Sequence, residues 1–207
     1  MSETHSTPSR GREAGFSIAE FLISTVILLG ISAAVFTLLG DTQRSSSYQT
    51  EVQATLENTR IAMDTVERYI RQAGNDPKNV GFAGVTITSS TQIRLRSDLT
   101  GSAVGNSDKG DPDGDTNDSG EDVTIQYNAG SRSIEVVPQG GTAQPIANYI
   151  SAFSMQGYNS TGAVTTDGTQ VKKIRVSITG SSTLPDPKTG ETFSLQLASD
   201  VQLATRQ

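Results

Sequence analysis

One acidic side chain lies where a carboxylate is costly: Glu20 is the only charged residue between Phe16 and Leu39. Fourteen of these 24 residues are Leu, Ile, Phe or Val, and about 20 apolar residues in a helix cross a hydrocarbon core of about 30 Å. The apolar residues favour membrane insertion by roughly 4–8 kcal/mol, which outweighs the cost of roughly 3 kcal/mol for one acid. No Lys, Arg or His lies in the stretch. We therefore expect a membrane-spanning helix whose carboxylate pairs with another chain or with a terminal amine created by cleavage.

A second group of acidic and amide side chains lies in a glycine-containing segment, residues 106–122, and comprises Asp108, Asp111, Asp113, Asp115, Asn117, Asp118, Glu121 and Asp122. Alternating oxygen side chains suit Ca²⁺, which takes about six to eight oxygen ligands. The spacing gives as candidate ligands Asp111, Asp113, Asp115, Asn117 and Asp122. The segment is not an EF-hand, because Thr116 stands where that loop requires glycine and no flanking helices are expected. The other interpretation is a solvated, mobile acidic loop that repels other chains.

The residues around Glu20 form a motif, Gly15-Phe16-Ser17-Ile18-Ala19-Glu20-Phe21, after a short polar leader. This motif resembles the class III signal of type IV pilins and type II secretion pseudopilins. The resemblance implies that residues 1–15 are a leader peptide, that a membrane prepilin peptidase cuts between Gly15 and Phe16, and that the new terminus at Phe16 is methylated. It also implies that Glu20, the fifth residue after cleavage, pairs with the terminal amine of a neighbouring subunit during assembly.

The composition excludes several kinds of chemistry. The chain has no cysteine, so it can form no disulfide, thiol nucleophile or thiolate metal site. Its one histidine is His5, which lies in the leader that the resemblance implies is removed. Ser-His-Asp and Cys-His catalysis are thereby excluded in the processed chain, and we expect no enzyme. A net charge of −6 gives no basis for inferring nucleic-acid binding, which needs a basic patch.

The helix is expected to continue beyond the apolar stretch as an amphipathic helix. Apolar and small residues recur there at spacings of four and three, namely Val52, Leu56, Thr59, Met63, Val66, Ile70 and Ala73. No proline occurs between Phe16 and Gly74, while Gly74 and Pro77 are typical of a helix end. The sequence thus predicts a transmembrane or filament-core helix over residues 16–40 and an amphipathic second half over residues 41–74.

Residues 75–207 show the alternation of a β-rich head that contains the acidic loop 106–122. The candidate strands are residues 82–88, 92–97, 122–128, 132–137, 152–158, 171–179 and 193–203. The predicted fold class is α+β, in which the second half of the long N-terminal helix packs against a mostly antiparallel sheet. This arrangement is similar to the pilin fold.

Further segments are similar to PilW-like minor pilins: residues 69–77, 122–128, 144–150 and 173–178. The resemblance implies a structural subunit, of the minor kind, of a type IV pilus or type II secretion pseudopilus. Its implied partners are other pilins or pseudopilins, the prepilin peptidase, the inner-membrane assembly platform, and the lipid bilayer before assembly. It implies a single-pass protein of the bacterial inner membrane with a periplasmic C-terminal domain, which then enters a pilus or pseudopilus. The alternative is a signal-anchored periplasmic binding module that never polymerises.

Overall fold

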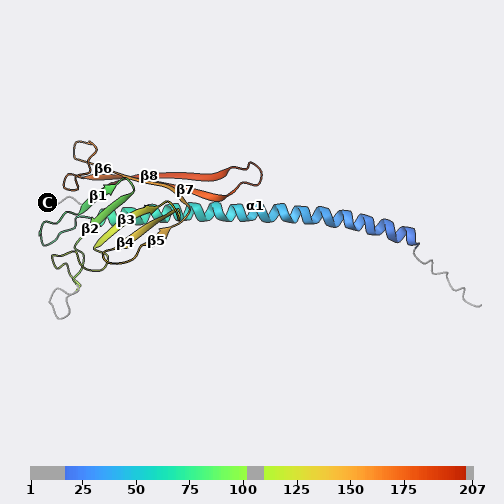
Figure 1. Ribbon diagram of the computed structural model, residues 1–207, viewed down its shortest axis with the longest axis horizontal. Coiled ribbons are helices and arrows are strands. Elements are labelled where there is room, and N and C mark those ends of the chain that lie inside the picture. Colours follow the sequence, from blue (N-terminus) through green and yellow to red (C-terminus); the bar gives the residue numbers. More distant parts are fainter. Residues whose placement is uncertain (1–16, 102–109, 204–207) are drawn as a thin grey trace, which may run out of the picture. The chain divides into compact units, whose positions relative to one another are not determined.

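The computed structural model describes residues 17–101 and 110–203, and it divides the chain into two compact units, Met1–Ser45 and Ser46–Gln207. One helix, α1 (Ile18–Gln72), runs through both units and is followed by eight described strands. The strands form two antiparallel sheets, one of five strands and one of three (Figure 1). The α+β class predicted from the sequence is therefore confirmed, with the β-structure divided between two sheets.

The helix α1 begins and ends where the sequence provides the signals. The backbone amide of Ala19 donates to the hydroxyl of Ser17 at 3.3 Å, which caps the first turn. Gly74 has a φ of +80°, a left-handed conformation that glycine adopts without a steric penalty, and this conformation takes the chain out of the helix. Its amide donates to the Arg96 carbonyl at 2.8 Å, so the helix end is joined to a strand of the larger sheet.

The second half of α1 buries one face against the strands. Its buried residues are Thr55, Thr59, Ala62, Met63, Val66 and Ile70. The predicted stripe is correct from Thr59 onward, but at its start Val52 and Leu56 are only half-buried while Thr55 is fully buried. The reason lies in Gly180 of the smaller sheet, because a Cβ built on this glycine would lie 2.1 Å from Oγ1 of Thr59. The sheet approaches so closely here that the small threonine side chains fill the interface.

The larger sheet has the strand order β1-β2-β3-β4-β5. Its strands are β1 (Val85–Ser89), β2 (Gln92–Arg96), β3 (Asp122–Asn128), β4 (Ser133–Pro138) and β5 (Gln144–Ala147). Four of them match candidate strands within a few residues. The fifth, β5, lies outside the candidate strands, and it contains Pro145. Proline cannot donate to a strand ladder, and β5 tolerates it as the last strand in the order.

The smaller sheet comprises β6 (Ile150–Tyr158), β7 (Lys173–Pro185) and β8 (Thr192–Gln202), in that order. The β7 strand extends six residues beyond its predicted end at Thr179, into a long hairpin with β8. The carboxylate of Glu51 on α1 accepts hydrogen bonds from the amide and hydroxyl of Thr183, so the helix is joined to this hairpin. Side chains from α1 and from both sheets form one core, which includes the fully buried Ile70, Ile93, Ile125, Ile134, Ile174 and Ile178.

The close contact at Gly180 gives a first prediction. Replacing Gly180 by Ala places a methyl group against Thr59, so the helix and β7 must move apart. We expect a loss of about 1–3 kcal/mol in the free energy of unfolding, as for overpacked cores, and a fall of about 2–4 °C in Tm per kcal/mol. Thermal unfolding of the full chain in detergent measures this loss. The control is Gly141→Ala, whose new Cβ would meet its nearest atom at 3.4 Å, and equal effects of the two changes would contradict the explanation.

A second prediction concerns Glu135 on β4, which is 8% exposed. Its carboxylate accepts hydrogen bonds from Gln126 Nε2 at 3.0 Å and Asn128 Nδ2 at 2.9 Å. These bonds hold the pKa of Glu135 below its ordinary value, although partial burial opposes the effect.

Because the folded pKa is the lower one, Glu135 stabilises the fold above its unfolded pKa, and this contribution is lost as the pH falls through the folded pKa. Between pH 7 and pH 3 we therefore expect the native chain to lose more stability than Glu135→Gln, which cannot titrate at this position. Thermal unfolding at the two pH values compares them. Parallel losses in both proteins would show that Glu135 does not contribute.

Candidate functional site

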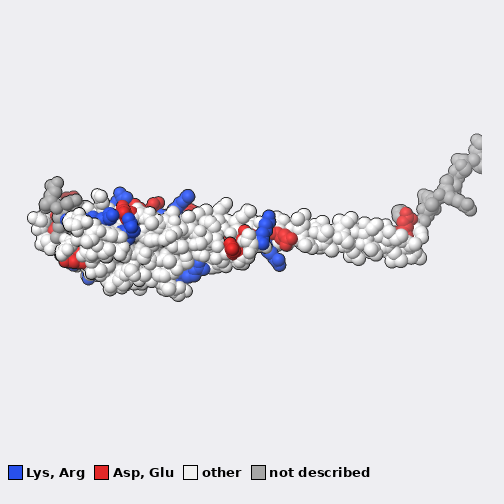
Figure 2. Space-filling model, turned by 90° about the horizontal axis from the view of Figure 1, so that it is seen from above, with Lys and Arg blue, Asp and Glu red and all other residues white. Residues whose placement is uncertain are grey.

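The first candidate site is Glu20, in the first turn of α1. The predicted cleavage residues Gly15 and Phe16 lie outside the described residues. Glu20 is followed by apolar side chains that are about half to three-quarters exposed: Phe21, Leu22, Ile23, Val26, Ile27, Leu28, Leu29, Ile31, Val35, Phe36, Leu38 and Leu39. Figure 2 shows this stretch as white between charged groups. These side chains therefore need a cover that the described chain does not supply.

By length and composition α1 contains one segment apolar enough to cross a membrane, with a mean hydropathy of 2.4 and none of that segment buried. Hydroxyl side chains in this segment donate back to the helix, as Ser24 does to the Glu20 carbonyl at 2.8 Å and Thr25 to the Phe21 carbonyl at 2.8 Å. Polar groups that bond to their own helix are tolerated in lipid, because no backbone or hydroxyl group is left unpaired. Glu20 alone presents a charge there. The helix is therefore compatible with membrane anchoring.

The second candidate site is the acidic loop, and two buried carboxylates form its framework. Asp98, which is fully buried, accepts hydrogen bonds from the amides of Asp113 at 3.1 Å and Gly114 at 3.0 Å. Glu121, which is 1% exposed, accepts from the amides of Leu99 at 2.7 Å and Thr100 at 2.8 Å. Buried carboxylates are stable only when such donors replace water. The two residues thus hold the ends of the loop to the strands β2 and β3.

Three carboxylates on this framework lie close together: single oxygens of Asp113, Asp115 and Asp118 are within 4.8 Å of one another. Asp113 also accepts from the Asp115 amide at 3.1 Å, and Asp115 from the Asn117 amide at 2.8 Å. Oδ2 of Asp118 is buried and has no hydrogen-bond partner among the described residues. A hard cation would supply the missing partner and offset the repulsion between the three charges. The three carboxylates therefore provide oxygen ligands of the kind that calcium binds.

The other expected ligands are placed differently. Asp122 lies in β3 and is 5% exposed. Its carboxylate forms a bidentate ion pair with the guanidinium of Arg94 on β2. The hydrogen bonds from this pair raise the pKa of Arg94 above its ordinary value. Asp111 and Asn117 are exposed and belong to no group of converging acids in the described chain, while Asp108 lies outside the described residues. The structure therefore brings Asp118, rather than Asp122, together with Asp113 and Asp115.

Three residues that build this site, Asp98, Asp118 and Glu121, differ in how far the sequence could reveal them. Asp118 and Glu121 were part of the acidic segment, but only the fold shows which of its carboxylates converge. Asp98 directly follows Ser97 after β2 and resembles any surface aspartate in the sequence. No local signal marks it, because its partners lie 15 and 16 residues further along the chain.

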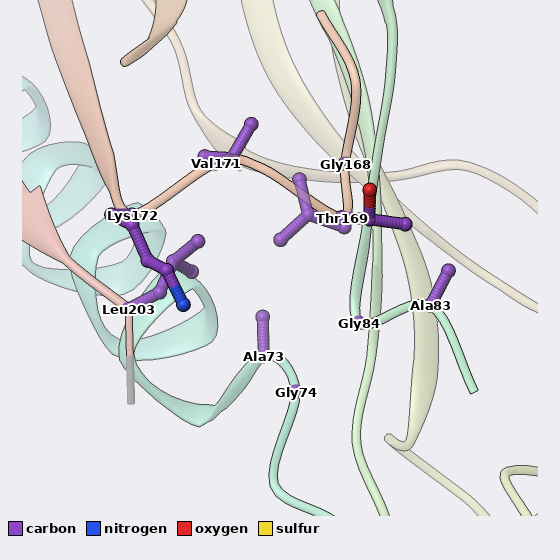
Figure 3. A pocket seen from close by; sticks show the side chains of 10 residues that line it. Ala73, Gly74, Ala83, Gly84, Gly168, Thr169, Val171, Lys172 and Leu203 are labelled. Carbon is purple, nitrogen blue, oxygen red and sulfur yellow. The ribbon is translucent and has the colours of Figure 1, made fainter. Parts of the chain in front are cut away.

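A small cavity of about 60 Å³ lies where the end of α1 meets β1 and the segment before β7 (Figure 3). Glycines make this approach possible, since a Cβ on Gly84 would lie 2.3 Å from Cα of Gly74. A Cβ on Gly168 would lie 1.8 Å from the Val85 carbonyl oxygen. Apart from Lys172, the lining consists of backbone, small and aliphatic groups with one threonine, so it offers no pair of groups for acid–base chemistry.

Comparison with known proteins adds no family to these observations. No protein-family model matches the sequence, and no curated protein matches it significantly. The structure by itself defines the class of protein, an α+β chain with one long apolar N-terminal helix and two antiparallel sheets.

The acidic loop gives the third prediction. Calcium should raise the Tm of the full chain in detergent, because a ligand that binds only the folded state stabilises it, by about 2.7 kcal/mol at 100 times its Kd. Replacing Asp113 and Asp115 together by Asn should remove this rise. The control is Glu191→Gln, which removes an exposed acid of the β7–β8 hairpin and should leave the rise intact. A chain indifferent to millimolar calcium would favour the solvated acidic loop instead.

Proposed function

We propose that this chain is a structural subunit, of the minor kind, of a type IV pilus or a type II secretion pseudopilus. After processing by a prepilin peptidase it assembles through its N-terminal helix. The observation that carries the proposal is a helix with apolar side chains exposed on all sides and one acid, Glu20, in its first turn. The motif around Gly15 and Phe16, which resembles the prepilin signal, supports the same conclusion.

The physical argument begins with cover for the apolar helix. Before assembly the lipid bilayer of the inner membrane covers residues 18–39, and the second unit stands on the periplasmic side. In a filament the helices of neighbouring copies replace the lipid, and they do so at little cost because both surroundings are apolar. A carboxylate among packed apolar helices is stable only next to a cation. The amine freed at Phe16 of a neighbouring copy supplies that cation, which makes Glu20 an assembly residue.

The proposal also assigns a role to the second unit, residues 46–207. It has a core of its own, formed by the second half of α1 and both sheets, and it presents polar strand faces and the acidic loop to the surroundings. Its described part contains no histidine or cysteine and no cluster of acids other than the loop. We therefore assign the second unit a structural role. The N-terminal helix packs into the filament, and the second unit is displayed on the filament surface.

The fourth prediction tests processing and assembly together. Terminal sequencing and mass measurement of the membrane-embedded protein should find a methylated Phe16 as the first residue. Glu20→Ala should still insert, because it removes a membrane cost of roughly 3 kcal/mol. It should lower the amount of the protein in sheared filaments by about tenfold or more, the change that 1.4 kcal/mol produces.

The matched control is Asp41→Ala, which removes the next acid along the same helix, beyond the apolar stretch. It should leave the amount in filaments unchanged. A mature membrane protein that retains Met1, and whose Glu20→Ala variant behaves like the native chain, would overturn the proposal. That result would favour the signal-anchored periplasmic binding module.

A further inference from the structure

The strand β8 forms one edge of the smaller sheet, whose strand order is β6-β7-β8. It is 11 residues long and contains no proline, lysine or arginine, and its register against β7 runs without a bulge from Gln202 to Ser194. Its one charge, Asp200, is paired, since the carboxylate is 3.0 Å from Nζ of Lys173 and 2.7 Å from Nε of Arg175. Short length, bulges, prolines and lysines are the usual features that keep an edge strand from pairing with another chain. The strand β8 has none of them.

The other three edges of the two sheets are protected. The strand β5 has four residues, one of which is Pro145. On β1 the chain at Gly168 approaches so closely that a Cβ there would lie 1.8 Å from the carbonyl oxygen of Val85. On β6 the amide of Met155 donates to the carbonyl of Ser90 at 2.6 Å, so the β1–β2 turn covers this edge. Among the described residues, β8 is therefore the edge that the fold leaves open.

The hydrogen bonds of β8 show which of its backbone groups face outward. The amide of Leu203 donates to the carbonyl of Lys172 at 3.0 Å, and the amide of Phe193 donates to the hydroxyl of Ser182 at 3.0 Å, both on the side of β7. In an antiparallel pair this direction alternates from one residue to the next. The odd-numbered residues of β8 thus face β7. The outward N–H and C=O groups belong to Ser194, Gln196, Ala198, Asp200 and Gln202.

The side chains of β8 define the strand that would fit beside it. Phe193, Leu195 and Leu197 lie on the same face as the buried Val201, but they are only half-buried. The residues between them are exposed. An added strand would cover the half-buried side chains if its own residues alternate between apolar and polar in the same sense. Because Asp200 is already compensated, this strand needs no charge opposite it.

The direction of β8 excludes a second copy of the same chain as the partner. Gly180 of β7 lies against Thr59 of α1. Further along β7, Thr183 binds Glu51, which comes earlier in α1. The strand β7 therefore runs antiparallel to α1, and β8 runs parallel to it.

Two free β8 edges can meet only through a two-fold rotation. If the two strands pair antiparallel, α1 of the second copy points the opposite way, and the two chains cannot be anchored in one membrane. If they pair parallel, the half-buried apolar side chains of the two copies lie on opposite faces of the joined sheet and do not cover one another. The fitting strand therefore belongs to a different protein.

We propose that β8 is a docking edge for an extended strand of a different protein, which joins the smaller sheet as a further strand. The inference rests on the proposed function, from which it takes the class of the partner: another subunit of the same filament, with a prepilin-type helix of its own. The partner strand exchanges backbone hydrogen bonds with the even-numbered residues from Ser194 to Gln202 and packs apolar side chains beside Leu195 and Leu197. The main-chain bonds supply affinity, and the alternation of side chains fixes the register.

The fifth prediction uses the photo-crosslinking residue benzoylphenylalanine in the full chain, made in its native cells. At Gln196 it lies on the open edge, and at Ala152 it lies in the same row of the exposed face but two strands away, on β6. Irradiation should give one product from Gln196 and none from Ala152. Mass spectrometry of the cross-linked peptides should identify a different protein that carries a prepilin-type motif. Equal products from both positions, a product of two copies of this chain, or a partner without that motif would overturn the proposal.

Proline variants test whether the contact uses the backbone. Ala198→Pro removes an outward N–H that β7 does not use, so the chain should still fold, as thermal unfolding in detergent checks. It should lower the yield of the Gln196 product about tenfold. The matched control Ala198→Thr keeps the amide and should leave the yield unchanged. Ser194→Pro removes a second outward amide and repeats the test, and a product that survives both prolines would overturn the proposal.

Failure of this contact can be told apart from failure of the proposed function. Chains that are cleaved and methylated at Phe16 but give no product from Gln196 would overturn the contact and leave the subunit function standing. Chains that keep Met1 would overturn the subunit function on which the contact rests.

Discussion

The first half of α1 presents apolar side chains in every direction, and no described part of the chain covers them. A bare apolar helix of this length is not stable in water, since each buried large side chain gains roughly 1.5–3 kcal/mol. The helix therefore requires lipid or other helices around it. In both surroundings one carboxylate, Glu20, is the only group whose charge must be compensated. The proposed assembly mechanism follows from this requirement.

The second half of the same helix has the opposite property, because its partners come from its own chain. One face of it is buried against two sheets, and the approach to β7 is close enough that only glycine fits at position 180. Glu51 joins the helix to the β7–β8 hairpin, and Gly74 joins its end to the larger sheet. The helix thus carries a folded unit at one end and an uncovered surface at the other. A filament subunit needs both properties.

The two charged surfaces of the second unit depend on buried or paired carboxylates. Asp98 and Glu121 hold the acidic loop to the ends of two strands, and Asp200 orders the cations at the start of β7. The acidic loop uses two carboxylates structurally and the cations of β7 use one, and the other charged groups of both surfaces lie nearer the solvent. The calcium interpretation therefore concerns a loop that two buried carboxylates already hold in place.

Local patterns in the sequence determined much of this architecture. The run of apolar residues, the absence of proline before Gly74, and the alternation in strands such as Asp122–Asn128 each act over a few neighbouring residues, so they could be recognised without a structure. The strand β5 could not be recognised in this way. Proline argues against a strand unless the strand is known to lie at the edge of its sheet, and only the fold shows that β5 does.

Only the tertiary structure decided which acids meet. Asp122 pairs with Arg94, 28 residues before it, because the register of β2 against β3 brings the two side chains together. Asp98 binds amides of a loop that is distant in sequence, and Asp118 converges with Asp113 and Asp115 because Glu121 also accepts from its amide. Charge and spacing along a chain show that carboxylates are present. Which of them are paired, buried or left to bind a partner depends on contacts between segments that the sequence does not place side by side.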